Sequence, residues 1–298
     1  MIFLYTPADG NQTEGIGAVA QCQIHAYVLS RMMQVEFVGR PFTGLQHYQE
    51  YSTQEEYCDA VTDFFNLQFN KVDLSNAKIA KAERIDNSLV EFINQHRMTA
   101  DEIYVELPTA QLQSFADANF DAYKDAGYHS TLAKRIRFDE SKYYFNDDKL
   151  NIGIHITNFI EGRDNDLSAQ REQYVPGNSK EQYYINLINK LNELLSKNSD
   201  IEIEFHIYSR GEEKDFEVFT NLDVSVKLHL WEHPLTSIYH LTKSDIRVLS
   251  NSSFSYMSAL FGAENGMSII RDNFAMKIDN CVITDYHGNF DESQICFE

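Results

Sequence analysis

The side chains with the clearest chemical potential lie in a run of small hydroxyl residues near the C-terminal third of the chain. An apolar segment, 246–249, predicts a buried strand, and Ser250-Asn251-Ser252-Ser253-Phe254-Ser255 follows it directly. A helix-like pattern over 254–262 comes next. Serine hydroxyls beside the N–H groups of a first helical turn can bind a phosphate or another anion. The run therefore predicts a diphosphate-binding site, with helix capping as the alternative, because Ser and Asn commonly begin helices.

Two earlier predicted strands also end in residues with polar side chains. The segment 150–156 predicts a strand that carries His155, and the segment 201–208 predicts a strand followed by Ser209. Alternating strands and helices over this half predict a parallel sheet, in which ligands bind at the carboxyl ends of the strands. His155, Ser209 and Ser250 all lie at such ends. Their shared position favours a binding site over three unrelated core residues, although a hydrogen-bonded histidine beneath the site is the alternative for His155.

The order of these motifs resembles the fucosyltransferase-like GT-B glycosyltransferases, a superfamily that contains α1,2-, α1,6- and protein O-fucosyltransferases. In that superfamily the first strand bears a His-x-Arg element and the next ends in a hydroxyl or an acid. The last is followed by a Ser-Ser-Phe-Ser-like turn that faces the diphosphate of the nucleotide sugar. The resemblance implies that Ser209, Ser252, Ser253 and Phe254 of this chain bind the sugar donor.

The resemblance extends to the N-terminal half. Thr13-Glu14-Gly15-Ile16-Gly17-Ala18, a helix to about Met33 and a strand at 35–38 are similar to the family's Gly-x-Gly loop, first helix and second strand. This similarity implies donor contacts by Gly15 and Gly17, with a turn that needs positive φ as the alternative. A dinucleotide enzyme is not indicated, because the third glycine of the fingerprint is missing.

One departure from the family concerns the arginine of the His-x-Arg element. Thr157 stands two residues after His155, where the family has Arg, and a longer segment follows before the next Gly and Asp. A guanidinium at this point would bind a diphosphate bidentately and offset the charge of the leaving group. Arg163 is the predicted replacement, and Arg171 is the less favoured one.

Sugar transfer with inversion also needs a base near the acceptor hydroxyl. Glu14 occupies a position similar to that of a proposed base in some protein O-fucosyltransferases. His155 is expected to orient or stabilise rather than to act as the base. No Asp-x-Asp pair ends a predicted strand, so neither a divalent metal nor another cofactor is expected, as the resemblance also implies. The carboxylates that compete with Glu14 are Asp9, Glu161, Asp164 and Asp166.

Composition limits the classes of partner. The 298 residues carry a formal net charge of −20, which argues against nucleic acid and anionic membranes. An anionic nucleotide sugar would then need local basic residues, for which Arg40, Arg163, Arg210 and Arg247 are the candidates. No apolar stretch of about twenty residues and no basic leader occur, so we expect a cytoplasmic protein that does not insert into a membrane. The four cysteines have no metal-site spacing.

The periodicity of the chain predicts an α/β protein with two Rossmann-like halves. The resemblance implies the GT-B arrangement, in which two such domains face a central cleft. The polar segment 139–149 predicts the connection between them. We therefore expect an acceptor-side domain at 1–145 and a nucleotide-sugar-binding domain at 146–298. Helices are predicted at 54–65, 88–96 and 112–123 in the first half, and at 180–197, 213–220, 235–241 and 254–262 in the second.

These features together predict an inverting, metal-independent glycosyltransferase that moves a sugar from a nucleoside diphosphate sugar to a glycan acceptor. The resemblance favours fucose and a GDP-sugar. Xylose or another neutral sugar, or a UDP-sugar, stays open because of the missing arginine. The alternative from another class is a glycan-binding or scaffold protein that keeps the fold without catalysis.

Overall fold

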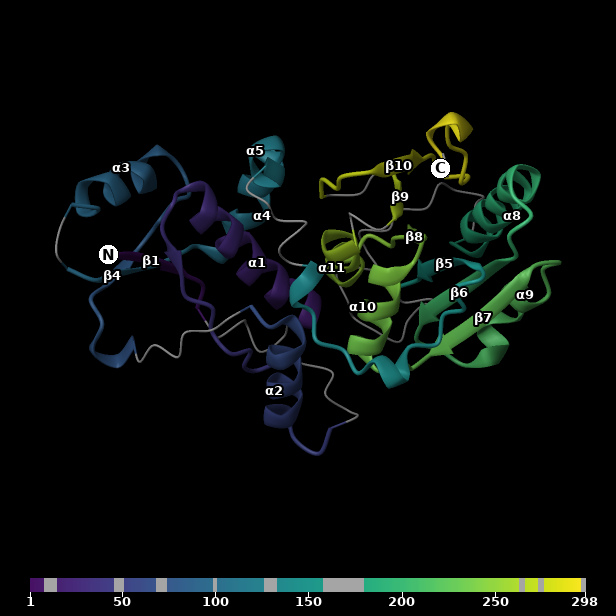
Figure 1. Ribbon diagram of the computed structural model, residues 1–298, viewed down its shortest axis with the longest axis horizontal. Coiled ribbons are helices and arrows are strands. Elements are labelled where there is room, and N and C mark those ends of the chain that lie inside the picture. The colour runs from purple at the N-terminus through teal and green to yellow at the C-terminus, as the bar shows by residue number, and fades with distance from the viewer. Residues whose placement is uncertain are drawn as a thin grey trace. The chain divides into compact units, whose positions relative to one another are not determined.

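The chain forms two compact units, Met1–Arg137 and Phe138–Glu298. The computed structural model describes residues 1–7, 15–45, 51–67, 74–98, 101–125, 133–157, 180–262, 266–272 and 276–295. Within these ranges each unit combines one parallel sheet with helices (Figure 1). The predicted α/β class with two Rossmann-like units is confirmed. The predicted central cleft stays a prediction.

The first unit is built on a four-stranded sheet with the order β2-β1-β4-β3. The strands are β1 (Ile2–Tyr5), β2 (Glu36–Phe37), β3 (Ile79–Lys81) and β4 (Ile103–Glu106). The helices are α1 (Ile16–Met32), α2 (Gln54–Phe65), α3 (Asn87–His96), α4 (Thr109–Ala118) and α5 (Phe120–Asp125). Leu4 pairs with Val105 across β1 and β4, and both side chains are buried against Leu29 of α1. The carboxyl ends of β1 and β4 therefore lie side by side.

The second unit is built on a six-stranded sheet with the order β10-β9-β8-β5-β6-β7. The strands are β5 (Leu150–His155), β6 (Ile203–Ser209), β7 (Ser225–Leu230), β8 (Ile246–Val248), β9 (Met267–Arg271) and β10 (Cys281–Thr284). The helices are α8 (Lys180–Asn198), α9 (Glu217–Thr220), α10 (Pro234–Lys243) and α11 (Ser253–Gly262). Counted from β5, the strand order is 3-2-1-4-5-6, that of the doubly wound dinucleotide-binding fold. The order reverses between β5 and β8.

The core of the second unit explains why these segments form strands and helices. Leu187, Leu191 and Leu195 recur every fourth residue on α8, so they form one apolar face that packs on the sheet. Nearly every residue of β6 is buried, which is typical of a parallel strand covered on both faces. Gly153 of β5 allows a close approach, because a Cβ atom there would lie 2.3 Å from the Oγ of Ser244.

The boundary between the two units lies before residue 138, whereas the sequence predicted it after residue 145. The reason is aromatic packing. The ring of Phe138 stacks on Tyr239 with centroids 3.9 Å apart, and Tyr144 stacks on His240 at 3.6 Å. The Tyr144 hydroxyl also donates to the hydroxyl of Tyr208 on β6 at 3.0 Å. The segment 138–145 is therefore part of the second unit rather than a free connection.

Two further differences from the predicted elements have local causes. The helix expected at 112–123 is divided into α4 and α5, because Asn119 leaves the helical region with φ −119° and ψ 33°. The edge strands β3 and β10 were not predicted. Both are short, and the outward side chains Ile79 and Ile283 are exposed, so neither strand has the continuous apolar run of a buried strand.

Candidate functional site

The strand order of the second unit brings the predicted polar residues together. His155 ends β5, Thr157 follows it, and Ser250 lies two residues after β8. Because β5 and β8 are neighbours at the point where the strand order reverses, their carboxyl ends lie at the position where open α/β sheets bind ligands. The sequence-predicted residues His155 and Ser250 therefore meet, although they are far apart in the chain.

A hydrogen-bonded network joins these two strand ends to helix α11. The Nδ1 atom of His155 lies 2.8 Å from the Oγ of Ser250 and 2.5 Å from the Oγ of Ser255. The two serine Oγ atoms are 3.1 Å apart. The Thr157 hydroxyl lies 2.6 Å from that of Ser250. We call these four residues, His155, Thr157, Ser250 and Ser255, the hydroxyl–imidazole network.

The serine run divides into two parts with different surroundings. Ser250 and Ser255 are almost fully buried, so their hydroxyls hold the network together from inside. Ser252, Ser253 and Phe254 are only half-buried. The Ser252 Oγ accepts a hydrogen bond from the Phe254 backbone N–H at 3.2 Å, which is the bond of an N-cap residue. The capping alternative therefore holds for Ser252, and Ser253 is the first residue of α11.

The aromatic ring of Phe254 closes one side of the histidine. Its centroid lies 4.8 Å from that of His155, with a tilt of 34° between the planes. Ser209 at the end of β6 donates from its hydroxyl to the Ile156 carbonyl oxygen at 2.7 Å, so it ties β6 to the segment that follows β5. Ser209 is half-buried. Phe254 and Ser209, two of the predicted donor-binding residues, thus lie beside the carboxyl end of β5.

One basic candidate is placed where it cannot meet a ligand. Arg247 is fully buried, and its guanidinium donates to the carbonyl oxygens of Leu241, Thr242 and Ser244 at 3.1–3.4 Å. These carbonyls belong to the end of α10, so Arg247 serves as a buried C-terminal cap. The expectation that Arg247 supplies charge to the nucleotide is therefore wrong.

In the first unit, the predicted glycines lie at the start of α1. Gly15 is its N-cap, with φ −80° and ψ 170°, and Gly17 lies in its first turn. Neither has a positive φ, so the turn alternative that required one is wrong. A glycine N-cap provides no side chain to accept from the first-turn N–H groups. These groups therefore retain the capacity to bind an anion or a hydroxyl.

The carboxyl edge of the first sheet also carries an acid that the sequence analysis missed. Glu106 ends β4 beside the end of β1, and its Oε2 accepts from the Tyr5 hydroxyl at 3.0 Å. Burial and this hydrogen bond raise the pKa of Tyr5 to about 12. The guanidinium of Arg40 lies 6.0 Å from the centroid of the Tyr5 ring. The apolar pattern of the sequence predicts a strand near 102–105, which stops one residue short of Glu106, so this residue was not recognised as a strand-end carboxylate.

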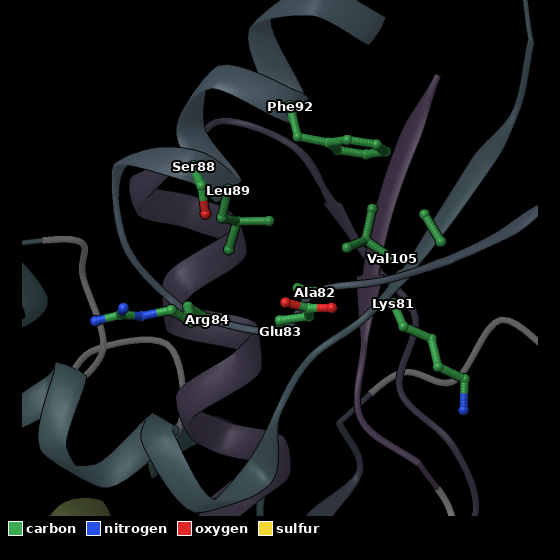
Figure 2. A pocket seen from close by; sticks show the side chains of 9 residues that line it. Lys81, Ala82, Glu83, Arg84, Ser88, Leu89, Phe92 and Val105 are labelled. Atoms are coloured by element: carbon green, nitrogen blue, oxygen red, sulfur yellow. The ribbon is translucent and has the colours of Figure 1, made fainter.

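A pocket of about 190 Å³ lies between β3, β4 and α3 (Figure 2). Figure 2 shows the apolar side chains of Leu89, Phe92 and Val105 and the polar side chains of Glu83, Arg84 and Ser88 around it. The basic side chains that line it already have partners, since Arg84 pairs with Asp86 and Lys81 with Glu106, each at 3.0 Å. None of the predicted site residues lines this pocket.

Several predicted residues lie outside the described ranges. They are Glu14 and Arg163, the competing acids Asp9, Glu161, Asp164 and Asp166, and Arg171. Across the ranges that the structure does describe, no three His, Cys, Asp or Glu side chains are arranged to hold a metal ion. No helix in those same ranges is long and apolar enough to cross a membrane.

Comparison with known proteins gives matches in shape only. No family model matches the chain, and no curated protein sequence does. Among solved structures, POFUT1 in complex with GDP overlaps it with a TM-score of 0.46 at 11% identity, covering 96% of this chain and 98% of that one. POFUT1 in complex with GDP-fucose has a TM-score of 0.46 at 11% identity, covering 93% of this chain and 98% of that one. The E. coli heptosyltransferase WaaC with ADP has a TM-score of 0.47 at 11% identity, covering 99% of this chain and 96% of that one.

Proposed function

We propose that this protein is a glycosyltransferase that takes its sugar from a nucleoside diphosphate sugar and transfers it to a glycan. The observation that carries the proposal is the hydroxyl–imidazole network at the reversal point of the second sheet, directly before the first turn of α11. The carboxyl edge at such a reversal point is where α/β sheets bind nucleotides, and the first turn of a helix favours phosphate. The motif order that resembles the fucosyltransferase-like superfamily supports the same function.

In this proposal the second unit binds the donor and the first unit faces the acceptor. Ser253 and the first-turn N–H groups of α11 hold the diphosphate, and Phe254 and Ser209 border it. His155 is held in place by Ser250 and Ser255, and we assign it an orienting or stabilising role at the donor. Gly15 and Gly17 stay the donor contacts that the resemblance implies. We favour GDP-fucose as donor, with xylose or another neutral sugar and a UDP-sugar as the alternatives.

The chemical step in this proposal is a direct displacement. The acceptor hydroxyl loses its proton to a carboxylate and attacks the anomeric carbon, the bond from that carbon to the diphosphate oxygen breaks, and the configuration inverts. Glu14 is the proposed base, and Arg163 is the proposed cation that offsets the charge growing on the diphosphate. No divalent metal takes part in this scheme.

One observation favours the second candidate function, a glycan-binding or scaffold protein without catalysis. Thr157 occupies the position of the family's arginine, and its hydroxyl is bonded to Ser250 at 2.6 Å. Position 157 therefore offers a neutral hydroxyl where leaving-group charge would need a cation.

Donor binding is tested first by thermal unfolding of the protein with GDP, UDP, CDP, their sugars and inorganic phosphate. A ligand that binds only the folded state raises its stability by mass action, by about 2.7 kcal/mol at a hundred times its Kd. We expect a nucleoside diphosphate to raise the Tm and inorganic phosphate at equal concentration to do little. If no nucleotide changes the Tm or gives heat in calorimetry, the proposal fails.

Catalysis is tested by Arg163→Ala, with Arg171→Ala, the less favoured replacement for the missing arginine, as the comparison and Arg84→Ala, an exposed arginine of the first unit, as the control. We expect Arg163→Ala to lower turnover about a hundredfold or more while donor affinity falls less, because the cation meets charge that grows in the transition state. Donor binding without transfer in the wild-type protein would instead favour the non-catalytic binder.

A further inference from the structure

The single tryptophan of the chain, Trp231, lies at the carboxyl edge of the second sheet. Trp231 directly follows β7 and is 55% exposed. Burial of a tryptophan is normally a large apolar gain, so exposing most of this ring forgoes stability. The stability of the fold therefore does not account for the exposed ring of Trp231.

The backbone holds Trp231 in an unfavourable conformation. Its φ is +57°, a region that a bulky residue adopts rarely and only at an energetic cost. Its N–H donates to the Ser209 carbonyl oxygen at 3.1 Å, and its indole Nε1–H donates to the Gly211 carbonyl oxygen at 2.9 Å. The only polar atom of the side chain is thus satisfied from within the protein. What Trp231 presents to solvent is a rigid aromatic surface.

The surroundings of Trp231 suit a planar, electron-rich ligand. The guanidinium carbon of Arg210, at the end of β6, lies 5.8 Å from the centroid of the indole ring. Arginine donors pair with the O6 and N7 atoms of guanine, and aromatic side chains stack on any nucleobase. The strand that precedes Trp231 is three places from β8 in the sheet, or about 14 Å at ordinary strand spacing. An extended nucleoside diphosphate spans a separation of this order.

We infer that Trp231, with Arg210, forms the subsite for the nucleobase of the donor, while the diphosphate lies at the carboxyl ends of β5 and β8. This inference rests on the proposed function, which it deepens by naming where the base is held. It also gives Ser209 a second role, because its carbonyl oxygen fixes the Trp231 backbone while its hydroxyl fixes the segment after β5.

The protein itself provides the probe, because Trp231 is the only source of tryptophan fluorescence. Emission is followed at the red edge of excitation during titration with GDP, UDP, guanosine and inorganic pyrophosphate, with calorimetry in parallel. We expect GDP and guanosine to quench the emission and pyrophosphate to bind without quenching. GDP is expected to bind more tightly than UDP, because a purine stacks over a larger area.

Variants separate stacking from loop geometry. Trp231→Gly accepts the positive φ without strain, so the loop keeps its shape while the ring is lost. We expect it to weaken GDP binding about 5- to 100-fold and to leave pyrophosphate binding unchanged. Trp231→Phe should retain affinity within about threefold, since it keeps an aromatic face. Ile283→Ala removes an equally exposed apolar side chain at the opposite edge strand, β10, and should change neither affinity.

The possible failures are distinguishable. GDP binding seen by calorimetry with unchanged emission and unchanged affinity in Trp231→Gly would overturn this inference and leave the proposed function intact. Quenching by free sugars but not by GDP or guanosine would overturn it in favour of carbohydrate stacking at Trp231. Absence of any binding by nucleotides and nucleosides in calorimetry would overturn both the inference and the proposed function.

Discussion

At the scale of single residues, neighbouring serines have separate tasks. Ser252 caps α11 through its side chain, whereas Ser253 is the first residue of that helix and is half-exposed. A cap stabilises the fold, and a hydroxyl at the first turn is available to a ligand. Substitution of Ser252 by alanine should therefore change stability, whereas substitution of Ser253 by alanine should change nucleotide affinity.

Ser252→Ala should lower the free energy of unfolding by about 1 kcal/mol, the usual value of an N-cap. Ser253→Ala should change stability by less than about 0.5 kcal/mol and weaken nucleotide binding by about 1–3 kcal/mol, because a charge-assisted hydrogen bond to phosphate is lost. Chemical unfolding and calorimetry on the same preparations make the comparison. Unchanged stability in Ser252→Ala together with weakened nucleotide binding would reassign Ser252 to the ligand.

The base is the second residue-scale prediction. Glu14→Gln should preserve donor binding and abolish most transfer, because the amide cannot accept the proton of the acceptor. Glu106→Gln is the matched comparison, since Glu106 is a carboxylate at the carboxyl edge of the first sheet. Transfer rates against pH with saturating donor give the measurement. Near-normal transfer by Glu14→Gln and a large loss in Glu106→Gln would move the assignment to Glu106.

At the scale of elements, a buried arginine joins the end of α10 to the end of α11. Arg247 satisfies three carbonyl oxygens near the end of α10. A Cβ atom added to Gly262, the last residue of α11, would lie 2.6 Å from its guanidinium carbon. The position of α11, and with it that of the predicted anion-binding turn, therefore depends on a contact at the opposite end of the helix.

Arg247→Met should destabilise the second unit by roughly 3 kcal/mol or more, because several buried carbonyls lose their donors. Gly262→Ala should also destabilise it, since the added methyl overlaps the guanidinium. Urea unfolding curves measure both changes. A control is Arg84→Met in the first unit, whose ion pair with Asp86 is exposed and should contribute less than about 1 kcal/mol. Equal effects of Arg84→Met and Arg247→Met would contradict the capping role.

At the scale of the whole molecule, each unit contains a buried histidine that resists protonation. Burial lowers the pKa of His25 in α1 to about 4, although its hydrogen bond to Gln113 acts in the opposite direction. Burial lowers the pKa of His206 on β6 to about 3, and the nearby His229 adds to the effect. An unfolded histidine titrates near 6.5. Between those values the unfolded chain binds protons that the folded chain does not.

The two neutral histidines should therefore contribute fully to the free energy of unfolding above pH 6.5. This contribution should fall as the pH falls toward 4, with up to about 1.4 kcal/mol lost per pH unit for each histidine. Urea unfolding at pH 7 and pH 5 measures the difference. His25→Gln and His206→Gln should each flatten the dependence, because glutamine does not titrate. A stability that is constant from pH 7 to pH 5 in the wild-type protein would contradict the burial of both rings.

The sequence alone was sufficient for the class of fold. Apolar segments with helical or continuous periodicity predicted most strands and helices of both units, because buried faces impose these patterns locally. It also identified His155, Ser209 and the serine run as strand-end residues. It did not reveal β3, β10 or the division of α4 from α5, since short edge strands and a single non-helical residue leave little periodic signal.

The contacts within the site depended on the packing of distant segments. His155 and Ser255 are 100 residues apart, and they meet because the sheet places β5 beside β8. The same packing buried Arg247 among carbonyls and exposed Trp231, although both residue types suggested the reverse. Strand order and burial are set by long-range contacts, which local propensity does not encode. The chemistry of the residues could therefore be read from the chain, but their neighbours could not.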